Sequence, residues 1–139
     1  MSGTVLHVEH VHLPCARRSR DLGLTLVLAT LGLPAVAVEC DANLGAEAFA
    51  SKCAACHSLE AGQHMTGPSL HELAGRRAGT VSGFNFSAAM SESGIVWSST
   101  SLEAFLTSPQ TYVRGTVMPF GGVKNATERA AIVCYLVTS

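Results

Sequence analysis

Apolar residues recur at helical spacing near both ends of the segment that begins at residue 40. In the first stretch, Asp41 or Asn43 can cap a helix that runs into Cys53. The residues that share one face of this helix are Leu44, Ala48 and Phe49. The pattern therefore predicts an amphipathic helix at the start of this segment.

The same spacing appears in "NATERAAIVCYLV", residues 125–137. Asn125 stands three residues before Glu128, which is typical of a capping box. The apolar stripe of this second helix consists of Ile132, Val133 and Leu136. The sequence thus predicts one helix at each end of the segment.

A third helix is predicted between them, from about Thr100 to Thr107. Thr100 and Glu103 have the spacing of a capping box, and Pro109 ends the helix. The remaining chain is rich in turn residues, as in "TGPS", "AGRRAGT" and "FGG", and it lacks the alternation of a strand. We expect an all-α fold with three main helices, short helical turns and long loops that need a centre to pack around.

The first part of the chain has a different pattern. Residues 22–38, "LGLTLVLATLGLPAVAV", form one apolar run. Arginines at positions 17, 18 and 20 precede this run, and Ala35-Val36-Ala37 closes it with an A-x-A site. This order is typical of a secretory signal peptide. The sequence therefore predicts a leader over residues 1–37 and a mature domain over residues 38–139.

An uncleaved membrane anchor is the alternative for this leader. The apolar run has 17 residues and is interrupted by Gly32 and Pro34, whereas a spanning helix needs roughly 20 apolar residues. Met1–Pro14 is longer than the basic region of a leader requires, which leaves open a true start codon further along the chain. Cleavage implies an exported protein, and the location that we expect is a bacterial periplasm.

Composition narrows the classes of function. The formal net charge is −1 and charged residues make up 14% of the chain, so nothing indicates binding to nucleic acid. Residues 38–139 carry six Lys and Arg residues against eight Asp and Glu residues. A domain of this size buries a small core, and small domains often need a covalent staple or a cofactor. The cysteines of this domain are Cys40, Cys53, Cys56 and Cys134.

The main candidate chemistry lies in "KCAACHSLE", residues 52–60, where His57 directly follows Cys53 and Cys56. A redox dithiol with this spacing normally lies beside a βαβ unit, which the pattern lacks. A structural zinc site needs four ligands, and His64 and His71 do not form a second pair. Cys-x-x-Cys-His is the spacing of c-type haem attachment, which is the favoured interpretation.

A second ligand for a haem iron has to come from elsewhere in the chain. Met118 lies in "RGTVMPF", where the Gly-Thr turn and Pro119 favour a rigid strap over the haem. Met65 follows His57 by only eight residues, too few to round the porphyrin edge. For Met118, ligation of a haem iron is thus favoured over core packing, which is the usual role of a methionine. The other candidates are Met65, Met90, His64 and His71.

With these features, residues 44–137 resemble class I cytochrome c, of the mitochondrial and bacterial soluble type. Gly45 and Phe49 resemble the residues at which the first helix of that family crosses the last, and Tyr135 resembles their aromatic partner. "KCAACH" matches the attachment motif. The resemblance implies the cytochrome c fold around one covalent haem c.

The resemblance also implies further site residues. "TGPSLHELAGRRAG" is similar to the loop after the attachment motif. In that loop Pro68 would offer its carbonyl to the imidazole of His57, and Arg76 and Gly79 would lie near the haem propionates. "SGFNFSAAMSESGIVW" is similar to the bottom loop of the family, in which Trp97 would donate its indole N–H to a propionate.

"YVRGTVMPF" is similar to the ligand loop of the family, with Met118 as distal ligand and Thr116 beside it. This region also contains departures from the family. Phe105 stands where many relatives have a tyrosine near the Met sulfur, and Met90 where an amide often stands, so we expect a drier pocket. Arg114 replaces a proline before the Gly-Thr turn, which loosens the strap.

The surface differs from that of mitochondrial relatives, which ring the haem edge with lysines. Lys52 and Lys124 remain at such positions. At other positions where those relatives have such lysines, this chain has Ala61, Gln110, Thr111 and Val117. Since electrostatic steering depends on this field of charge, we expect docking that depends weakly on salt and relies on apolar contact.

The resemblance implies a one-electron carrier rather than an enzyme, because His and Met ligands fill both axial positions and thioether ligation favours Fe(II). The expected partners of this monomer are a membrane cytochrome complex, a terminal oxidase, a reductase or a dehydrogenase. It would meet the membrane only transiently or through an uncleaved leader. Two alternatives are a haem sensor or peroxidase with a labile Met ligand, and a haem subunit of a larger redox enzyme.

The implied fold makes predictions about three further side chains. The first helix crosses the last in this fold, which would bring Cys40 toward Cys134, and export permits a disulfide between them. Two separate thiols are the alternative. His64 is expected either to hydrogen-bond across a loop, as a histidine does in relatives, or to be solvated.

Overall fold

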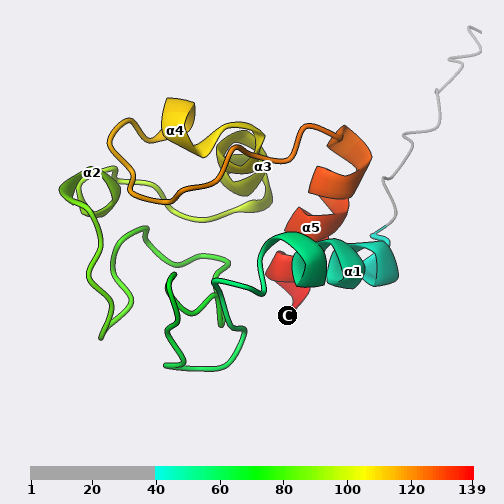
Figure 1. Cartoon of the computed structure of the whole chain (residues 1–139), viewed down its shortest axis with the longest axis horizontal. Coiled ribbons are helices and arrows are strands. Elements are labelled where there is room, and N and C mark those ends of the chain that lie inside the picture. The colour runs from blue at the N-terminus through cyan, green and yellow to red at the C-terminus, as the bar shows by residue number, and fades with distance from the viewer. Residues whose placement is uncertain (1–39) are drawn as a thin grey trace, which may run out of the picture. The chain divides into compact units, whose positions relative to one another are not determined.

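The computed structural model describes residues 40–139, whose arrangement is shown in Figure 1. The helices of these residues are α1 (Ala42–Lys52), α2 (Ala88–Ser91), α3 (Ser99–Thr107), α4 (Pro109–Tyr112) and α5 (Ala126–Thr138). Within residues 40–139 there is no β-strand, and one isolated antiparallel bridge joins Arg77 to Val96. The predicted all-α class, with three longer helices and short helical turns, is confirmed.

The predicted leader over residues 1–37 lies outside the described residues. The predicted start of the mature domain at residue 38 lies outside them as well. Within residues 40–139, no helix combines the length and the apolar character that crossing a membrane requires.

Helices α1 and α5 cross at a close approach of their backbones (Figure 1). Asp41 caps α1 by accepting a hydrogen bond from the backbone N–H of Leu44 at 2.9 Å. Gly45 lies buried at the crossing, where an added Cβ would come within 2.7 Å of the Cβ of Tyr135. The rings of Phe49 and Tyr135 pack with their centroids 5.7 Å apart. A side chain at Gly45 would therefore push the two helices apart.

A disulfide joins Cys40, which precedes the Asp41 cap of α1, to Cys134 within α5. Their Cα atoms are 5.8 Å apart, and the bond closes a loop with a sequence separation of 94 residues. The two cysteines without a disulfide in residues 40–139 are Cys53 and Cys56. Of the two alternatives for these cysteines, the structure thus has the disulfide, and the prediction of two separate thiols is wrong.

Helix α3 begins at Ser99, with Ser98 as its cap, rather than at the cap position predicted for Thr100. Ser98 accepts from the N–H of Ser101 at 3.2 Å, and Ser101 accepts from the N–H of Ser98 at 2.8 Å. This reciprocal pair satisfies two helix-end donors, and it prevails over the Thr100–Glu103 spacing because Glu103 instead binds Arg129.

Helix α5 supplies the centre of the core. Asn125 caps it as predicted, by accepting from the N–H of Glu128 at 3.0 Å. The carboxylate of Glu128 pairs with Lys52 of α1 at 3.4 Å, so the two helices are also joined by charge. The predicted apolar stripe is buried against α1 and α3, and it consists of Ile132, Val133 and Leu136.

The long segment between α1 and α2, residues 53–87, is held by turns and side chains rather than by helices. His64 connects two parts of it, since its Nε2 bonds the carbonyl of Ser82 at 2.8 Å and its Nδ1 accepts from the N–H of Ser69 at 3.1 Å. Of the two roles considered for His64, the loop-to-loop hydrogen bond is the one observed. These loops and the segment after α4 surround one large cavity.

Candidate functional site

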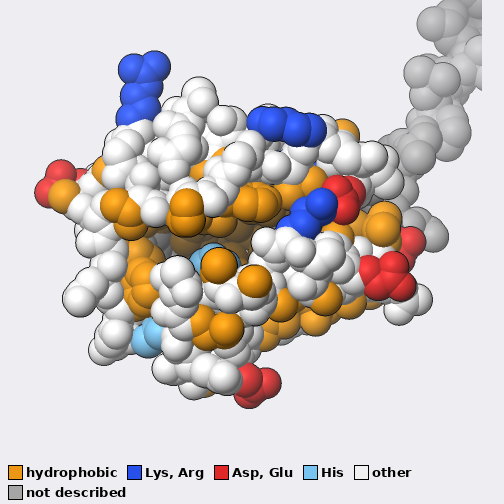
Figure 2. All heavy atoms as spheres, viewed as in Figure 1, with side chains coloured by type: hydrophobic (Ala, Val, Ile, Leu, Met, Phe, Trp, Pro, Cys, Tyr) orange, Lys and Arg blue, Asp and Glu red, His pale blue; other side chains and the backbone are white. Residues whose placement is uncertain are grey.

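A cavity of about 420 Å³ opens in the face shown in Figure 2, where hydrophobic side chains gather around a hollow. Residues from α1, the loops, α3 and the segment after α4 line this cavity. All nine predicted site residues are among them: Cys53, Cys56, His57, Pro68, Arg76, Gly79, Trp97, Thr116 and Met118. Of the other ligand candidates, Met90 lines the cavity, whereas Met65, His64 and His71 do not.

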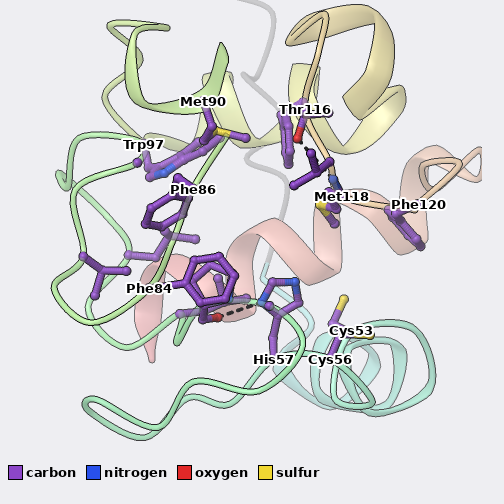
Figure 3. Close-up of a pocket in the computed structure, with 18 of the residues that line it drawn as sticks. Cys53, Cys56, His57, Phe84, Phe86, Met90, Trp97, Thr116, Met118 and Phe120 are labelled. Carbon is purple, nitrogen blue, oxygen red and sulfur yellow. Dashed lines mark hydrogen bonds between the residues drawn. The ribbon is translucent and has the colours of Figure 1, made fainter. Parts of the chain in front are cut away.

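The end of α1 positions the attachment motif. Cys53 is the C-cap of α1, and its carbonyl accepts from the N–H of Cys56 at 3.0 Å and of His57 at 2.9 Å. This turn places both thiols beside His57 on one side of the cavity (Figure 3). Burial raises the pKa of the Cys53 thiol to about 11, although nearby Lys52 opposes the rise. A protonated, buried thiol is unlike the thiolate of a redox dithiol.

His57 is oriented by the loop that follows it. Its Nδ1 donates to the carbonyl of Pro68 at 2.7 Å, which leaves Nε2 without a hydrogen bond among the described residues. Gly67 packs directly on the ring, since an added Cβ would lie 2.7 Å from Nδ1 and 2.8 Å from Nε2. Burial lowers the pKa of His57, while the Pro68 bond raises it. A neutral imidazole held in this way is the form that binds metals.

Met118 faces His57 from the opposite side of the cavity (Figure 3). Its N–H lies 3.4 Å from the hydroxyl oxygen of Thr116, which is buried. Its carbonyl accepts from the N–H of Phe120 at 2.9 Å and from the side-chain amide of Gln110 at 2.7 Å. The backbone of Met118 is therefore fixed by three hydrogen bonds while its thioether stays directed to the cavity.

Arg76 and Trp97 supply two polar donors of the cavity, and a backbone hydrogen bond joins these two residues. The N–H of Trp97 donates to the carbonyl of Arg76 at 2.9 Å, which joins the two residues. The guanidinium of Arg76 donates to the carbonyls of His71 and Ser69, at 2.8 and 3.0 Å. Burial lowers the pKa of Arg76. Within residues 40–139 no carboxylate pairs with Arg76 and no acceptor binds the indole N–H of Trp97.

Gly79 and the apolar residues shape the rest of the wall. Gly79 has a positive φ of 71°, and a Cβ there would lie 2.8 Å from the backbone nitrogen of Ser91. Buried Met90 and Phe105 cover the cavity near Trp97, whose ring centroid lies 5.1 Å from that of Phe105. The side chains of Met90 and Phe105 have no donor for a sulfur or a water molecule.

The similarity of the chain to known proteins is extensive. Residues 42–139 match the model of the family described as Cytochrome c. The chain is 41% identical to Cytochrome c 2.1 of Caenorhabditis elegans over 69% of this chain and 86% of that protein. It is 42% identical to Cytochrome c of Euglena viridis over 70% of this chain and 96% of that protein. The chain belongs to the cytochrome c family.

As a cytochrome c, the chain has the all-α fold of that family, binds one covalent haem c and serves as a haem electron carrier. The residues of the cavity fit this group. Cys53 and Cys56 supply two unpaired thiols beside His57. Arg76 and Trp97 supply donors without carboxylate partners among the described residues, which suits the two propionates. The apolar walls suit a porphyrin ring.

Two residues that shape this cytochrome c site were missed in the sequence. Gly67 packs against the imidazole ring of His57. Its position directly before Pro68 could have indicated that the backbone approaches a side chain closely there. Gln110 binds the carbonyl of Met118 across eight residues, and no sequence pattern signals such a contact. In the sequence, Gln110 stood out only as a replacement for a surface lysine.

Proposed function

We propose that this cytochrome c carries single electrons between redox proteins, and that His57 and Met118 would hold its haem iron. One observation carries the proposal: Nε2 of His57 and the side chain of Met118 face one another across the same apolar cavity (Figure 3). The bound haem supplies the chemistry by exchanging one electron between Fe(II) and Fe(III).

The residues of this chain would hold that iron in a closed, rigid site. Pro68 fixes the tautomer and the plane of His57 through the bond at 2.7 Å. Thr116 and Phe120 hold the backbone of Met118. The described lining contains no Asp or Glu that could act as a general base. The lack of a general base in this described lining supports a carrier over a peroxidase. Two protein ligands on the iron would support it as well, because a filled coordination shell leaves no place for a substrate.

We further propose that the chain is exported to a bacterial periplasm and works there as a monomer. The leader pattern of residues 1–37 supports export. The partners would be a membrane cytochrome complex, a terminal oxidase, a reductase or a dehydrogenase. Fractionation of the native host followed by mass spectrometry tests the location: a chain in the periplasmic fraction that starts at residue 38 supports export, and a chain confined to the cytoplasmic fraction contradicts it.

Visible spectroscopy of the holoprotein tests the ligand set. We expect low-spin c-type bands, one haem by the pyridine haemochrome assay and the weak Met-to-Fe(III) charge-transfer band that marks thioether ligation. Met118→Ala should lose this band and bind imidazole or CO. Met65→Ala is the matched control, because Met65 is exposed and does not line the cavity, and it should keep the band.

The same measurements separate the alternatives. A wild-type protein that is high-spin and binds CO would contradict the carrier and support a sensor or peroxidase. Gel filtration of native extracts addresses the other alternative, since a haem subunit of a larger enzyme would elute with that enzyme rather than as a monomer.

A further inference from the structure

The segment that carries Met118, residues 113–125, contains no helix, and we call it the Met118 loop. Thr116 is buried, but the two residues that flank Met118 directly give little anchorage, because Val117 is 73% exposed and Pro119 is exposed as well. Hydrogen bonds, rather than burial, therefore set the direction of this part of the loop.

The ends of the Met118 loop are well held. Val113, at its start, is buried, and the N–H of Thr116 donates to the Val113 carbonyl at 3.0 Å. At the other end, the N–H of Val123 donates to the carbonyl of Leu106 in α3 at 2.7 Å. The side chain of Arg129 donates to the carbonyl of Val123, also at 2.7 Å. The centre of the loop needs a separate anchor.

Gln110 supplies that anchor from α4. Its Nε2 donates to the carbonyl of Met118 at 2.7 Å, at the short end of the range for N–H···O bonds. The other two bonds of the Met118 backbone stay within the loop, at Thr116 and Phe120. Among the described residues, Gln110 is thus the side chain that connects the backbone of Met118 to a helix.

Helix α4, which carries Gln110, is itself held in place by a buried residue. Pro109 begins the helix and is fully buried, and its ring fixes the backbone angle φ. The hydroxyl of Ser108 donates to that of Thr111 at 2.9 Å across the first turn. Gln110 follows Pro109 directly, so the position of its side chain is set by a buried residue.

We propose that Gln110 is a positioning residue that holds the Met118 thioether toward the haem iron. The inference rests on the proposed His57 and Met118 ligation. Gln110 does not touch the iron, and it acts through the carbonyl of the ligand. Without this hydrogen bond, conformations of the Met118 loop in which the thioether leaves the iron become more populated.

Competition by imidazole measures this population in the ferric holoprotein, because imidazole binds iron only when Met118 has left. Gln110→Met keeps the length of the side chain and removes the donor. We expect imidazole to bind this variant about fivefold more tightly than wild type, which corresponds to one ordinary hydrogen bond. The Met-to-iron band should disappear at a correspondingly lower imidazole concentration.

Gln110→Glu separates the donated hydrogen bond from packing. The carboxylate has nearly the shape of the amide, but at neutral pH it can only accept and would face the Met118 carbonyl. Imidazole should therefore bind this variant at least as tightly as Gln110→Met. A Gln110→Glu protein with wild-type affinity would assign the effect to shape and overturn the proposal.

Gln63→Met is the matched control, since Gln63 is also an exposed, hydrogen-bonded glutamine and its oxygen accepts from Ser58 at 3.2 Å. It should leave imidazole affinity unchanged. An affinity of Gln110→Met within about twofold of the control contradicts the role of Gln110. If wild-type protein lacks the Met-to-iron band altogether, the proposed ligation fails instead, so the two failures are distinguishable.

Discussion

His57 shows how neighbouring residues prepare one side chain for its role. The carbonyl of Pro68 fixes Nδ1, and the absence of a side chain at Gly67 makes room for the ring. The two residues are adjacent, so one short stretch of backbone both orients and supports the imidazole. Burial lowers the pKa of His57, which favours the neutral form needed for binding iron.

Gly67→Ala adds one methyl group and should disturb the packing of the His57 ring on residue 67. The added Cβ overlaps the imidazole, so the ring or the loop has to move, and overpacking of this kind costs about 1–3 kcal/mol of unfolding free energy. Denaturant unfolding of the holoprotein measures the loss. Gly121→Ala is the control, because nothing lies within 4 Å of a Cβ at Gly121. Equal stability of both variants would contradict the proposed contact.

At the scale of elements, the α1 and α5 pair is fastened in three ways. Gly45 allows close approach, Lys52 and Glu128 form an ion pair at 3.4 Å, and a disulfide joins Cys40 to Cys134. The ion pair is partly exposed and contributes little by itself. The disulfide matters most, because it restricts the unfolded chain over a long loop.

Removal of this disulfide should lower the unfolding free energy by about 2–5 kcal/mol, since it closes a loop with a sequence separation of 94 residues. The double variant Cys40→Ala/Cys134→Ala avoids a leftover thiol. Unfolding with and without a reductant tests the effect: the reductant should destabilise wild type and leave the double variant unchanged. Wild type that is insensitive to a reductant able to cleave the bond would refute this.

At the scale of the whole molecule, two of the three Lys and Arg residues that line the cavity are engaged by other groups, and the exposed Arg77 is the exception among the described residues. Lys52 pairs with Glu128, and Arg76 is turned inward to backbone carbonyls. Lys124 donates to the carbonyl of Thr107 at 3.1 Å. Apolar side chains gather around the hollow instead, as Figure 2 shows, and Val117 is the most exposed large hydrophobic residue of the described segment 40–139.

Electron transfer to a purified redox partner should therefore depend weakly on ionic strength. Between about 0.01 M and 0.15 M the Debye length falls from about 30 to 8 Å, and we expect the second-order rate constant to change less than about threefold. Val117→Lys adds a cation at the rim and should make the rate steeper in salt with an acidic partner. A steep fall for wild type would contradict apolar docking.

Much of this protein follows from local sequence patterns. Asn125, and Asp41 as one of two candidates with Asn43, were predicted as caps because side-chain oxygens at such positions satisfy backbone donors within one turn. The start of α3 was misplaced, because two serines compete with Thr100 and only the tertiary contact of Glu103 with Arg129 decides between them. Local patterns are reliable where the partners are close in the sequence.

The sequence by itself predicted the three longer helices and the attachment motif, because spacing and residue type carry that information, whereas further site residues such as Pro68, Arg76 and Trp97 were implied by the resemblance to cytochrome c. Tertiary structure alone decided that Gln110 would hold Met118, that Gly67 would support His57 and that Cys40 would bond Cys134 rather than stay a thiol. These contacts depend on how loops and helices meet in space, and side chains reach one another only after the whole chain has packed.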